Sequence, residues 1–479
     1  RLNATADKRL QQLAQVPMIE RLEQRFLESA HRTALCIAGA SLTYGQLHAY
    51  SRAIAQKLEP LLAAHEGAWV VGICLPKCSA LYAGILAILG TGAVYLPLEP
   101  SHPLQRQQYI LENAGAVMLL HDGNHPLASE MPSMDINAID FDDVDLDQPL
   151  MRRRPALEAP CMALYTSGTT GHPKGVLLSQ ANLAHFTVWY ADYVHLTEDS
   201  HALQFSSLGF DSSLIDIFPT LLQGARLVVP GDDQRRDPLQ LVELICREQL
   251  SHAFLPPALL SILPLEQLQG LEHVMTGGDV CEPCVIEQLT RQGSLYNLYG
   301  PTEATVLITA RRLRSGDSNR TLGAPIANSQ VLILDEDLQP VTEHTVGELY
   351  IVGPGVCLGY LNDPQQTAER YLHLNLPDGQ TLRAYRTGDM AKWTEAGIEL
   401  CGRLDNQVKL ETKKHEAGET LLVRNDLYAP VQVELRLEQL DNVVGAPGKP
   451  ITLDGHGATL EGSDPLDPAQ PPRVTYAEL

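Results

Sequence analysis

Buried-strand and helical patterns alternate along much of this chain. Residues 69–75 (WVVGICL) are apolar and predict a buried strand, residues 79–89 carry small and aliphatic side chains at helical spacing, and residues 93–96 form the next apolar run. The alternation resumes with predicted helices at 180–193, 215–223 and 239–248 and predicted strands at 202–205 and 226–229. This rhythm predicts parallel sheets covered by helices, so we expect an α/β fold.

The pattern changes twice towards the C-terminus. Residues 320–400 combine Gly and Pro punctuation with short apolar runs, which predicts a β-rich region with strands at 330–334 and 347–351. Residues 420–479 contain seven prolines and one lysine. Strict alternation at 431–437 predicts a half-buried strand, and from Gly445 onward the composition predicts loop or disorder.

A stretch rich in hydroxyl groups and glycine lies between two short apolar runs. Residues 161–165 and 176–178 predict strands, so the loop between them is expected at the tip of a hairpin. Free N–H groups, hydroxyls and Lys174 could surround phosphate oxygens there. It is not a Walker loop, because Lys174 follows Pro173 and no Ser or Thr comes after it. The alternative is an ordinary surface turn.

Composition excludes several classes of function. The 479 residues carry a net charge of −23, which disfavours a nucleic-acid or anionic-membrane surface. No apolar run approaches the roughly 20 residues of a membrane span. Nine cysteines scattered through apolar segments fit reduced thiols and predict a cytoplasmic protein. The N-terminus has neither an initiator Met nor an apolar signal core, so we expect a piece of a longer protein.

Eight short motifs follow one another in a fixed order. They are LTY at 42–44, GAVYLPL at 92–98, the hydroxyl-rich loop at 164–176, FDSS at 210–213, NLYGPTE at 297–303, GELY at 347–350, YRTGD at 385–389 and GRLDNQVK at 402–409. Together the chain resembles an adenylation domain of a non-ribosomal peptide synthetase, in the superfamily of acyl-CoA synthetases and luciferase. The resemblance covers roughly residues 20–410.

The resemblance implies a fold and a division into domains. It implies a large core, residues 1–404, of two helix-covered, mostly parallel β-sheet subdomains plus a small β-barrel-like subdomain. Residues 405–419 would be the hinge and a degenerate start of the C-terminal subdomain. Residues 420–479 would be an unrelated tail, β-rich or partly disordered.

The resemblance also implies an ATP-dependent adenylate-forming ligase. ATP and an amino acid would give aminoacyl-AMP and pyrophosphate, with ATP and Mg²⁺ as cofactors. The aminoacyl group would be loaded onto a peptidyl carrier domain with a phosphopantetheine arm, in cis or in trans, beside a neighbouring condensation domain. The chain has no carrier-domain serine motif, so thioester formation would need another polypeptide.

Nucleotide contacts are carried over residue by residue. Lys174, Thr302 and Glu303 are the expected catalytic residues, with Glu303 also binding Mg²⁺ through its carboxylate. Tyr299 would stack on adenine, Asp389 would accept the ribose hydroxyls, and Arg403 would add a ribose or phosphate contact. The full expected set is Thr166, Ser167, Gly168, Thr169, Thr170, Gly171, Lys174, Gly277, Asn297, Tyr299, Gly300, Thr302, Asp389 and Arg403.

Each of these positions has a plainer alternative. Tyr299 could be a core tyrosine, Asp389 a turn residue after Gly388, and Glu303 an acid in the first turn of a helix.

The substrate class follows from Asp211. By resemblance an aspartate at this position pairs with the α-ammonium of an amino acid, and the alternative is an N-cap for the helix that follows. The expected pocket consists of Phe210, Asp211, Ser212, Ile215, Phe254, Met275, Gly277, Leu298, Val306 and Leu307. Apart from Asp211 it is uncharged and largely apolar, so a small or medium apolar amino acid is predicted.

The family pattern breaks after Lys409. Glu411, Thr412 and His415 replace an arginine, a glycine and an apolar residue, and no C-terminal catalytic lysine is identifiable in the 60 residues after Glu419. The hinge residue would be Asp405. We therefore expect binding with slow adenylation. A catalytically silent ATP- and amino-acid-binding remnant, a chimeric product and an acyl- or aryl-CoA ligase relative remain alternatives.

Overall fold

The computed structural model describes residues 5–65, 69–123, 125–139, 148–151, 154–166, 173–375, 379 and 381–404, and the backbone of seven strands between residues 409 and 476. The chain divides into two compact units. The first comprises residues 1–166, 174–331 and 351–385, and the second comprises residues 167–173, 332–350 and 386–479. The α/β prediction is confirmed, because two sheets and their connecting helices build the first unit.

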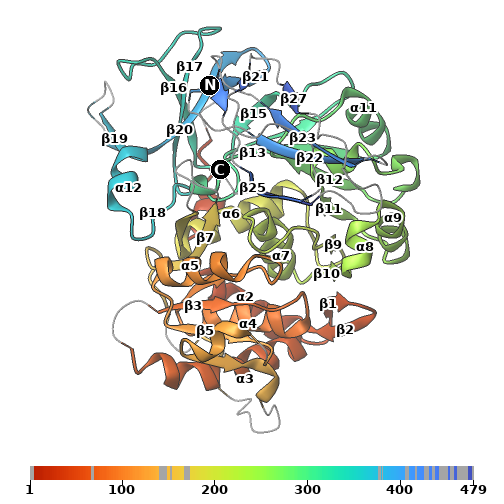
Figure 1. Ribbon diagram of the computed structural model, residues 1–479, viewed down its shortest axis with the longest axis vertical. Helices are drawn as coiled ribbons and strands as arrows, with labels where there is room; N and C mark the ends of the chain where they lie inside the picture. Colours follow the sequence, from red (N-terminus) through yellow and green to blue (C-terminus); the bar gives the residue numbers. More distant parts are fainter. Residues whose placement is uncertain are drawn as a thin grey trace. The chain divides into compact units, whose positions relative to one another are not determined.

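One sheet of the first unit runs in the order β18-β8-β7-β4-β3-β5-β6, and its strands β3 and β5 lie in the orange part of Figure 1. Its parallel part is β3 (Val70–Ile73), β4 (Val94–Pro97), β5 (Met118–His121), β6 (Ser133–Asp135) and β7 (Pro160–Thr166). β8 (Lys174–Ser179) and β18 (Gly359–Tyr360) add antiparallel strands at one edge. α4 (Ser79–Gly90) is buried on nearly every side, as a crossover helix in the core must be.

The other sheet of the first unit places the predicted site motifs at the ends of parallel strands. Its order is β15-β14-β13-β12-β11-β9-β10-β1-β2. The parallel strands are β1 (Thr33–Ile37), β9 (His201–Leu203), β10 (Arg226–Val229), β11 (His252–Phe254), β12 (His273–Gly277) and β13 (Ser294–Tyr299). β2 (Ala40–Thr43), β14 (Thr309–Leu313) and β15 (Thr321–Pro325) pair antiparallel.

Helices connect these strands. They are α1 (Lys8–Leu13), α2 (Met18–Glu28), α3 (Tyr44–Leu62), α5 (Leu104–Ala114), α6 (Gln180–Tyr193), α7 (Ser212–Leu222), α8 (Asp232–Arg236), α9 (Pro238–Arg247), α10 (Pro257–Leu260), α11 (Pro283–Gln292) and α12 (Pro364–Arg370). The predicted helix at 180–193 is confirmed to the residue, because the Ser179 side chain caps its first turn and closes a capping box with Asn182.

The second unit is β-rich, as the sequence predicts for residues 320–400. β16 (Gln330–Leu334), β17 (Gly347–Val352), β20 (Thr381–Thr394) and β21 (Gly397–Arg403) follow one another in its sheet. β20 and β21 are antiparallel, with Asp389 opposite Arg403. In the first unit, β19 (Tyr371–Asn375) pairs with residues 381–385 of β20.

The tail contains more strand than its composition predicts. β22 (Lys409–His415) pairs with β23 (Gly418–Arg424), β24 (Val431–Val433) with β26 (Ile451–Leu453), and β25 (Leu437–Asp441) with β28 (Arg473–Tyr476). β27 (Ala458–Leu460) pairs with β23. The expectation of loop from Gly445 onward is wrong for β26, β27 and β28. Their partners lie far back in the chain, and a local pattern cannot reveal such pairing.

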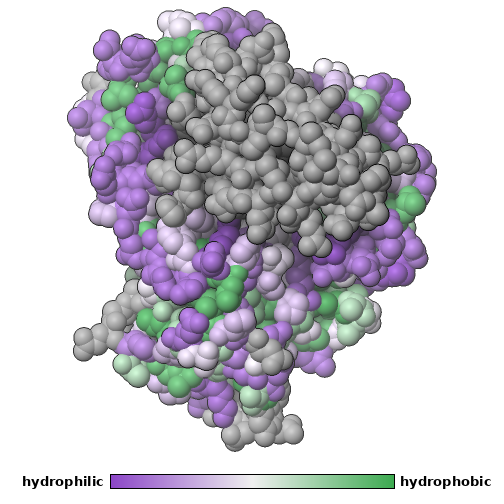
Figure 2. Space-filling model, in the orientation of Figure 1, coloured by the Kyte–Doolittle hydropathy of each residue, from purple (hydrophilic) through white to green (hydrophobic). Residues whose placement is uncertain are grey.

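The described surface is mixed in character. On the face shown in Figure 2 the apolar atoms lie in separate groups between hydrophilic ones. Among the described residues no helix has the combined length and hydropathy needed to cross a membrane.

Candidate functional site

The two strands that flank the predicted phosphate loop pair as a β-hairpin. Thr166 at the end of β7 lies opposite Lys174 at the start of β8, which confirms the predicted hairpin. Ser167, Gly168, Thr169, Thr170 and Gly171 lie outside the described residues. The buried Thr166 hydroxyl has no hydrogen-bond partner among the residues that the structure describes.

Lys174, Glu303 and Tyr360 form one cluster. The Lys174 Nζ lies 3.5 Å from Glu303 Oε1 and donates a hydrogen bond of 3.1 Å to the Tyr360 hydroxyl. The same Nζ lies 4.4 Å from the centre of the Tyr360 ring, at cation–π distance. The Tyr360 hydroxyl donates to Glu303 Oε1 at 2.6 Å. The predicted phosphate lysine and the predicted metal ligand therefore hold each other in this structure.

Two strands and a turn position this cluster. Glu303 lies on a single turn, η4 (Thr302–Ala304), directly after β13, and its backbone carbonyl accepts the Cys357 N–H at 2.9 Å. Tyr360 pairs with Val176 on β8, the strand that Lys174 begins. Burial, and secondarily the Glu303 carboxylate, raises the pKa of the Tyr360 hydroxyl, so it stays a neutral donor. Sequence reasoning missed Tyr360, because a single tyrosine in a short strand carries no local signal.

Asp211 occupies the N-cap position of α7, yet its side chain makes no capping hydrogen bond. Its Oδ2 instead accepts the Thr302 hydroxyl at 2.7 Å. Burial raises the pKa of Asp211 to about 6, opposed by the Thr302 hydroxyl, and Glu303 adds to the rise. Among the described residues no cation lies within ion-pair distance of Asp211. Asp211 is thus the N-cap residue of α7 by position, but its side chain does not make the capping hydrogen bond that the plain alternative requires.

Thr302 and Glu303 join the two halves of the site. These successive residues share the η4 turn, and Thr302 contacts Asp211 while Glu303 contacts Lys174. A group held by Asp211 and a group held by Lys174 would consequently be neighbours.

The expected pocket residues differ in exposure. Ile215, Met275, Leu298, Val306 and Leu307 are buried, Ser212 and Phe254 are half-buried, and the Phe210 side chain is 68% exposed. Gly277 is required by close packing, because a Cβ there would collide with the Leu298 carbonyl oxygen of the paired strand.

A small, mostly apolar cavity shares residues with this pocket, and some of the residues around it are polar ones that the sequence analysis missed. Ile215, Phe254 and Met275 line it together with Tyr190, Asp216, Thr220 and His252. The buried Tyr190 hydroxyl has no hydrogen-bond partner among the described residues. One signal for Asp216 was available, since it is the single acid in the otherwise uncharged helix α7.

The predicted nucleotide positions of the first unit lie at the end of β13. The Asn297 amide is buried and donates to the Asn319 carbonyl at 2.8 Å. Tyr299 ends the strand and is half-buried, so it is not the core tyrosine of the plainer alternative. A Cβ at Gly300 would collide with the Leu307 backbone, which explains the glycine.

The predicted ribose residues of the second unit pair with each other. Arg403 donates to Asp389 Oδ1 at 2.5 Å and to the Thr387 carbonyl at 3.3 Å. Asp389 lies within β20 and is 8% exposed, so the turn alternative does not hold for it. The expected hinge residue, Asp405, lies outside the described residues.

The described residues contain no group of three or more potential metal ligands. Mg²⁺ at nucleotide sites is commonly held by one or two carboxylates together with substrate phosphates, so a single acid such as Glu303 fits that ion. The second carboxylate of the site, Asp211, accepts the Thr302 hydroxyl through its Oδ2 in this structure.

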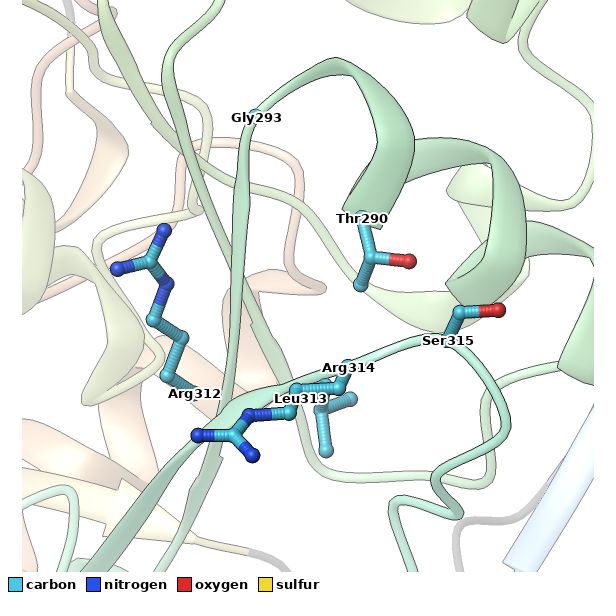
Figure 3. A pocket seen from close by; sticks show the side chains of 6 residues that line it. All are labelled: Thr290, Gly293, Arg312, Leu313, Arg314 and Ser315. Carbon is cyan, nitrogen blue, oxygen red and sulfur yellow. The ribbon is translucent and has the colours of Figure 1, made fainter.

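A larger surface pocket lies elsewhere, between α11 and β14. Its volume is about 310 Å³, and its lining contains none of the predicted site residues. In Figure 3 the guanidinium groups of Arg312 and Arg314 point away from Thr290 and Ser315. The pocket therefore offers no convergent set of polar groups, and we assign it no function.

Comparison with known proteins identifies relatives of this chain. The chain is 34% identical to bacitracin synthase 3 of Bacillus licheniformis over 423 residues, which is 87% of this chain and 6% of that protein. It is 32% identical to surfactin synthase subunit 1 of Bacillus subtilis (strain 168), over 90% of this chain and 12% of that protein. The chain thus spans only a small part of the length of these relatives.

Solved structures of non-ribosomal peptide synthetase proteins also resemble this chain. The non-ribosomal peptide synthetase FmoA3, in a form with α-methyl-L-serine-AMP bound, matches with a TM-score of 0.76 and 28% identity over 85% of this chain and 46% of that chain. The N-terminal subdomain of NpsA from Klebsiella oxytoca, in complex with 3-hydroxybenzoyl-AMSN, matches with a TM-score of 0.71 and 25% identity over 80% of this chain and 99% of that one.

These likenesses confirm the predicted resemblance to an adenylation domain and the predicted fold class. The model of one protein family, described as AMP-binding enzyme, matches residues 22–361. The chain therefore belongs to the AMP-binding enzyme family.

Proposed function

We propose that this chain activates an amino acid with ATP, forming aminoacyl-AMP and pyrophosphate for transfer to a carrier domain. The observation that carries the proposal is the state of Asp211. Its carboxylate is desolvated, accepts one hydroxyl and has no cation among the described residues. The α-ammonium of an amino acid would supply the missing positive charge.

In the proposed reaction an oxygen of the substrate carboxylate attacks the α-phosphorus of ATP. A new P–O bond forms to the carboxylate, the bond to the bridging oxygen breaks, and pyrophosphate leaves with that electron pair. Asp211 holds the ammonium, and Lys174 exchanges Glu303 for phosphate oxygens. Because Thr302 and Glu303 are adjacent, the substrate carboxylate would be placed near the phosphate.

Mg²⁺ would be held by Glu303 and would neutralise charge on the phosphates. Lys174 lies 3.5 Å from Glu303 Oε1 in this structure, and we expect it to leave that oxygen when phosphate oxygens become available to it. Tyr360 would keep the carboxylate in place during that exchange, because it donates to the same oxygen.

Relatives support the use of ATP. Two FmoA3 structures similar to this chain are described as AMPPNP-bound and α-methyl-L-serine-AMP-bound forms. The synthetase relatives support a carrier domain as partner. The Mg²⁺ ion, a neighbouring condensation domain, the cytoplasmic location, and the division at residues 1–404, 405–419 and 420–479 stay predictions.

A second candidate is the activation of an aryl acid. NpsA structures similar to this chain are described with 3-hydroxybenzoyl and 3-hydroxyanthranilyl ligands. The first of these acyl groups has no ammonium, so it would leave the half-buried Asp211 carboxylate without a cation. Asp211 therefore favours an amino acid.

ATP–pyrophosphate exchange with each of the twenty amino acids, benzoate and 3-hydroxybenzoate tests the proposal. We expect exchange with one or a few uncharged amino acids, at a rate below that of a complete adenylation domain. Exchange with the aryl acids alone would support the second candidate. No exchange with any acid, from protein that still binds AMPPNP, would indicate a silent binding module.

A further inference from the structure

The segment from Gln204 to Asp211 connects β9 to α7 and presents Asp211. It lies outside regular strand or helix. One backbone bond of 2.8 Å, from the Gln204 N–H to the Val228 carbonyl, ties its beginning to β10. Most of the remaining support for this segment comes from side chains of other elements.

Lys77, between β3 and α4, grips the first half of the segment. Its Nζ lies 3.5, 3.2 and 2.8 Å from the carbonyl oxygens of Gln204, Phe205 and Ser206. Three successive carbonyls thus curl around one ammonium group. A lysine can satisfy them because it carries three donors.

Asp216 holds the same residues from the opposite side. Its Oδ2 accepts the Ser206 N–H at 2.9 Å and the Gln204 side-chain amide at 3.3 Å. The Gln204 amide also donates to the Ser206 carbonyl, and its Oε1 accepts the Tyr82 hydroxyl at 2.9 Å. Asp216 is 3% exposed and Gln204 is fully buried.

Glu99 fixes the second half of the segment. Its Oε1 accepts the Gly209 N–H at 3.0 Å and also contacts the Ser207 hydroxyl. Phe210 and Asp211 follow directly, so the end that bears the candidate ammonium acceptor is held two residues before it.

The two charges of Lys77 and Asp216 are costly to keep. Burial lowers the pKa of Lys77 to about 8, and burial raises the pKa of Asp216 to about 7. Apolar residues of similar volume often stabilise a fold as well as buried charged groups do. Fold stability alone therefore does not explain why Lys77 and Asp216 are buried here. Charged groups form strong, directional hydrogen bonds, and those of Lys77 and Asp216 hold the backbone of the 204–211 segment.

We propose that Lys77 and Asp216 are positioning residues that hold the 204–211 segment so that Asp211 meets the substrate ammonium. The expected effect on amino-acid capture rests on the proposed function. The support that Lys77 and Asp216 give to residues 204–211 does not depend on that function. A small displacement of Asp211 would weaken amino-acid capture, since misplacement by about 1 Å can cost two orders of magnitude in rate.

The kinetic test compares Lys77→Met with Lys77→Arg in ATP–pyrophosphate exchange. In Lys77→Met we expect the KM for the amino acid to rise about ten-fold or more, with the KM for ATP changed less than about two-fold. Lys77→Arg keeps a cationic donor and should recover much of the loss. Equal increases in both KM values, or none, in folded protein would overturn the proposal.

A matched control comes from another hydrogen-bonded carboxylate of the same unit. Glu23 pairs with His48 at 3.3 Å and accepts the Leu150 and Met151 N–H groups, but contacts none of residues 204–211 in these bonds. Glu23→Gln should lower the melting temperature to a similar degree without separating the two KM values. If Glu23→Gln also raised the KM for the amino acid more than the KM for ATP, the change seen in Lys77→Met would be assigned to loss of stability.

Hydrogen exchange gives a readout that does not need turnover. In Lys77→Met and in Asp216→Asn, peptides covering residues 204–211 should exchange about ten-fold faster than in the unaltered chain, and in Glu23→Gln they should not. Unchanged exchange in both variants would refute the positioning role even if the chain proved inactive. Faster exchange without any amino-acid-dependent activity would uphold it while the proposed function fails.

Discussion

Lys174 and Glu303, on the phosphate side of the proposed site, hold their charges against each other, whereas Asp211, on the ammonium side, holds its charge against a hydroxyl. We expect the first arrangement to open when phosphate oxygens bind Lys174. The second needs only a cation. One side of the site therefore exchanges partners on binding, and the other gains a partner that it lacks.

Asp211→Asn is expected to have the largest effect, and it tests whether Asp211 serves the ammonium and not the nucleotide. The amide keeps the size and the hydrogen bond of the side chain but removes its charge. We expect kcat/KM for the amino acid to fall about 10²–10³-fold, because the ammonium loses its only counter-ion, while AMPPNP binding stays unchanged. Exchange kinetics and equilibrium nucleotide binding measure the two quantities. A loss of AMPPNP affinity of similar size would mean that Asp211 serves the nucleotide instead.

Glu303→Gln should change nucleotide binding and catalysis in opposite directions. Removing this carboxylate frees Lys174 and also removes a negative charge facing the phosphates. In EDTA we expect tighter AMPPNP binding, and with Mg²⁺ we expect exchange to fall about 10²-fold. Calorimetry with and without Mg²⁺ distinguishes the two conditions. Weaker nucleotide binding under both conditions would contradict the exchange of partners proposed for Lys174.

Tyr360→Phe is expected to act less strongly and on the phosphate side alone. It deletes the bonds to Glu303 and Lys174 and keeps the ring. We expect kcat/KM for ATP to fall about ten-fold with little change in the KM for the amino acid. Tyr371→Phe is the matched control, since the buried Tyr371 hydroxyl has no partner among the described residues. An equal effect in both variants would assign the loss to general packing.

The pH dependence of stability gives the smallest predicted effect. The folded-state pKa of Asp211 is raised to about 6 from the ordinary value of 3.8. The folded state therefore binds the proton more tightly, and the stabilisation present below pH 4 is lost as pH rises through about 6. Relative to Asp211→Asn, the unaltered chain should lose about 1 kcal/mol of unfolding free energy over that range. Urea unfolding at pH 4 and pH 7.5 measures the difference, and parallel curves for the two proteins would contradict the raised pKa.

Local patterns predicted elements whose signals lie within a few residues. The helix at 180–193 has its capping box in sequence, and the strands at 226–229 and 330–334 are apolar runs between clear breaks. The strands of the tail pair with partners up to 39 residues away, as in Leu421 with Leu460, so composition alone predicted loop.

The site was predicted where the residues belong to ordered motifs. Asp211, Thr302, Glu303 and Lys174 do, and the structure brings them together in two linked contacts. Tyr360 and Lys77 form hydrogen bonds to groups distant in sequence, and Asp216 to groups on the far side of a loop, so no local pattern reveals those partners. The pairing of Lys174 with Glu303 was likewise invisible, because it depends on β8 and η4 meeting in space.

The central claim is that Asp211 receives the α-ammonium of the substrate. The most direct test is exchange with the preferred amino acid and with its des-amino analogue, the same acid without the ammonium, in the unaltered chain and in Asp211→Asn. We predict a preference for the amino acid of about 10²-fold or more in the unaltered chain and a preference near unity in the variant. Equal use of both acids by the unaltered chain would contradict the claim.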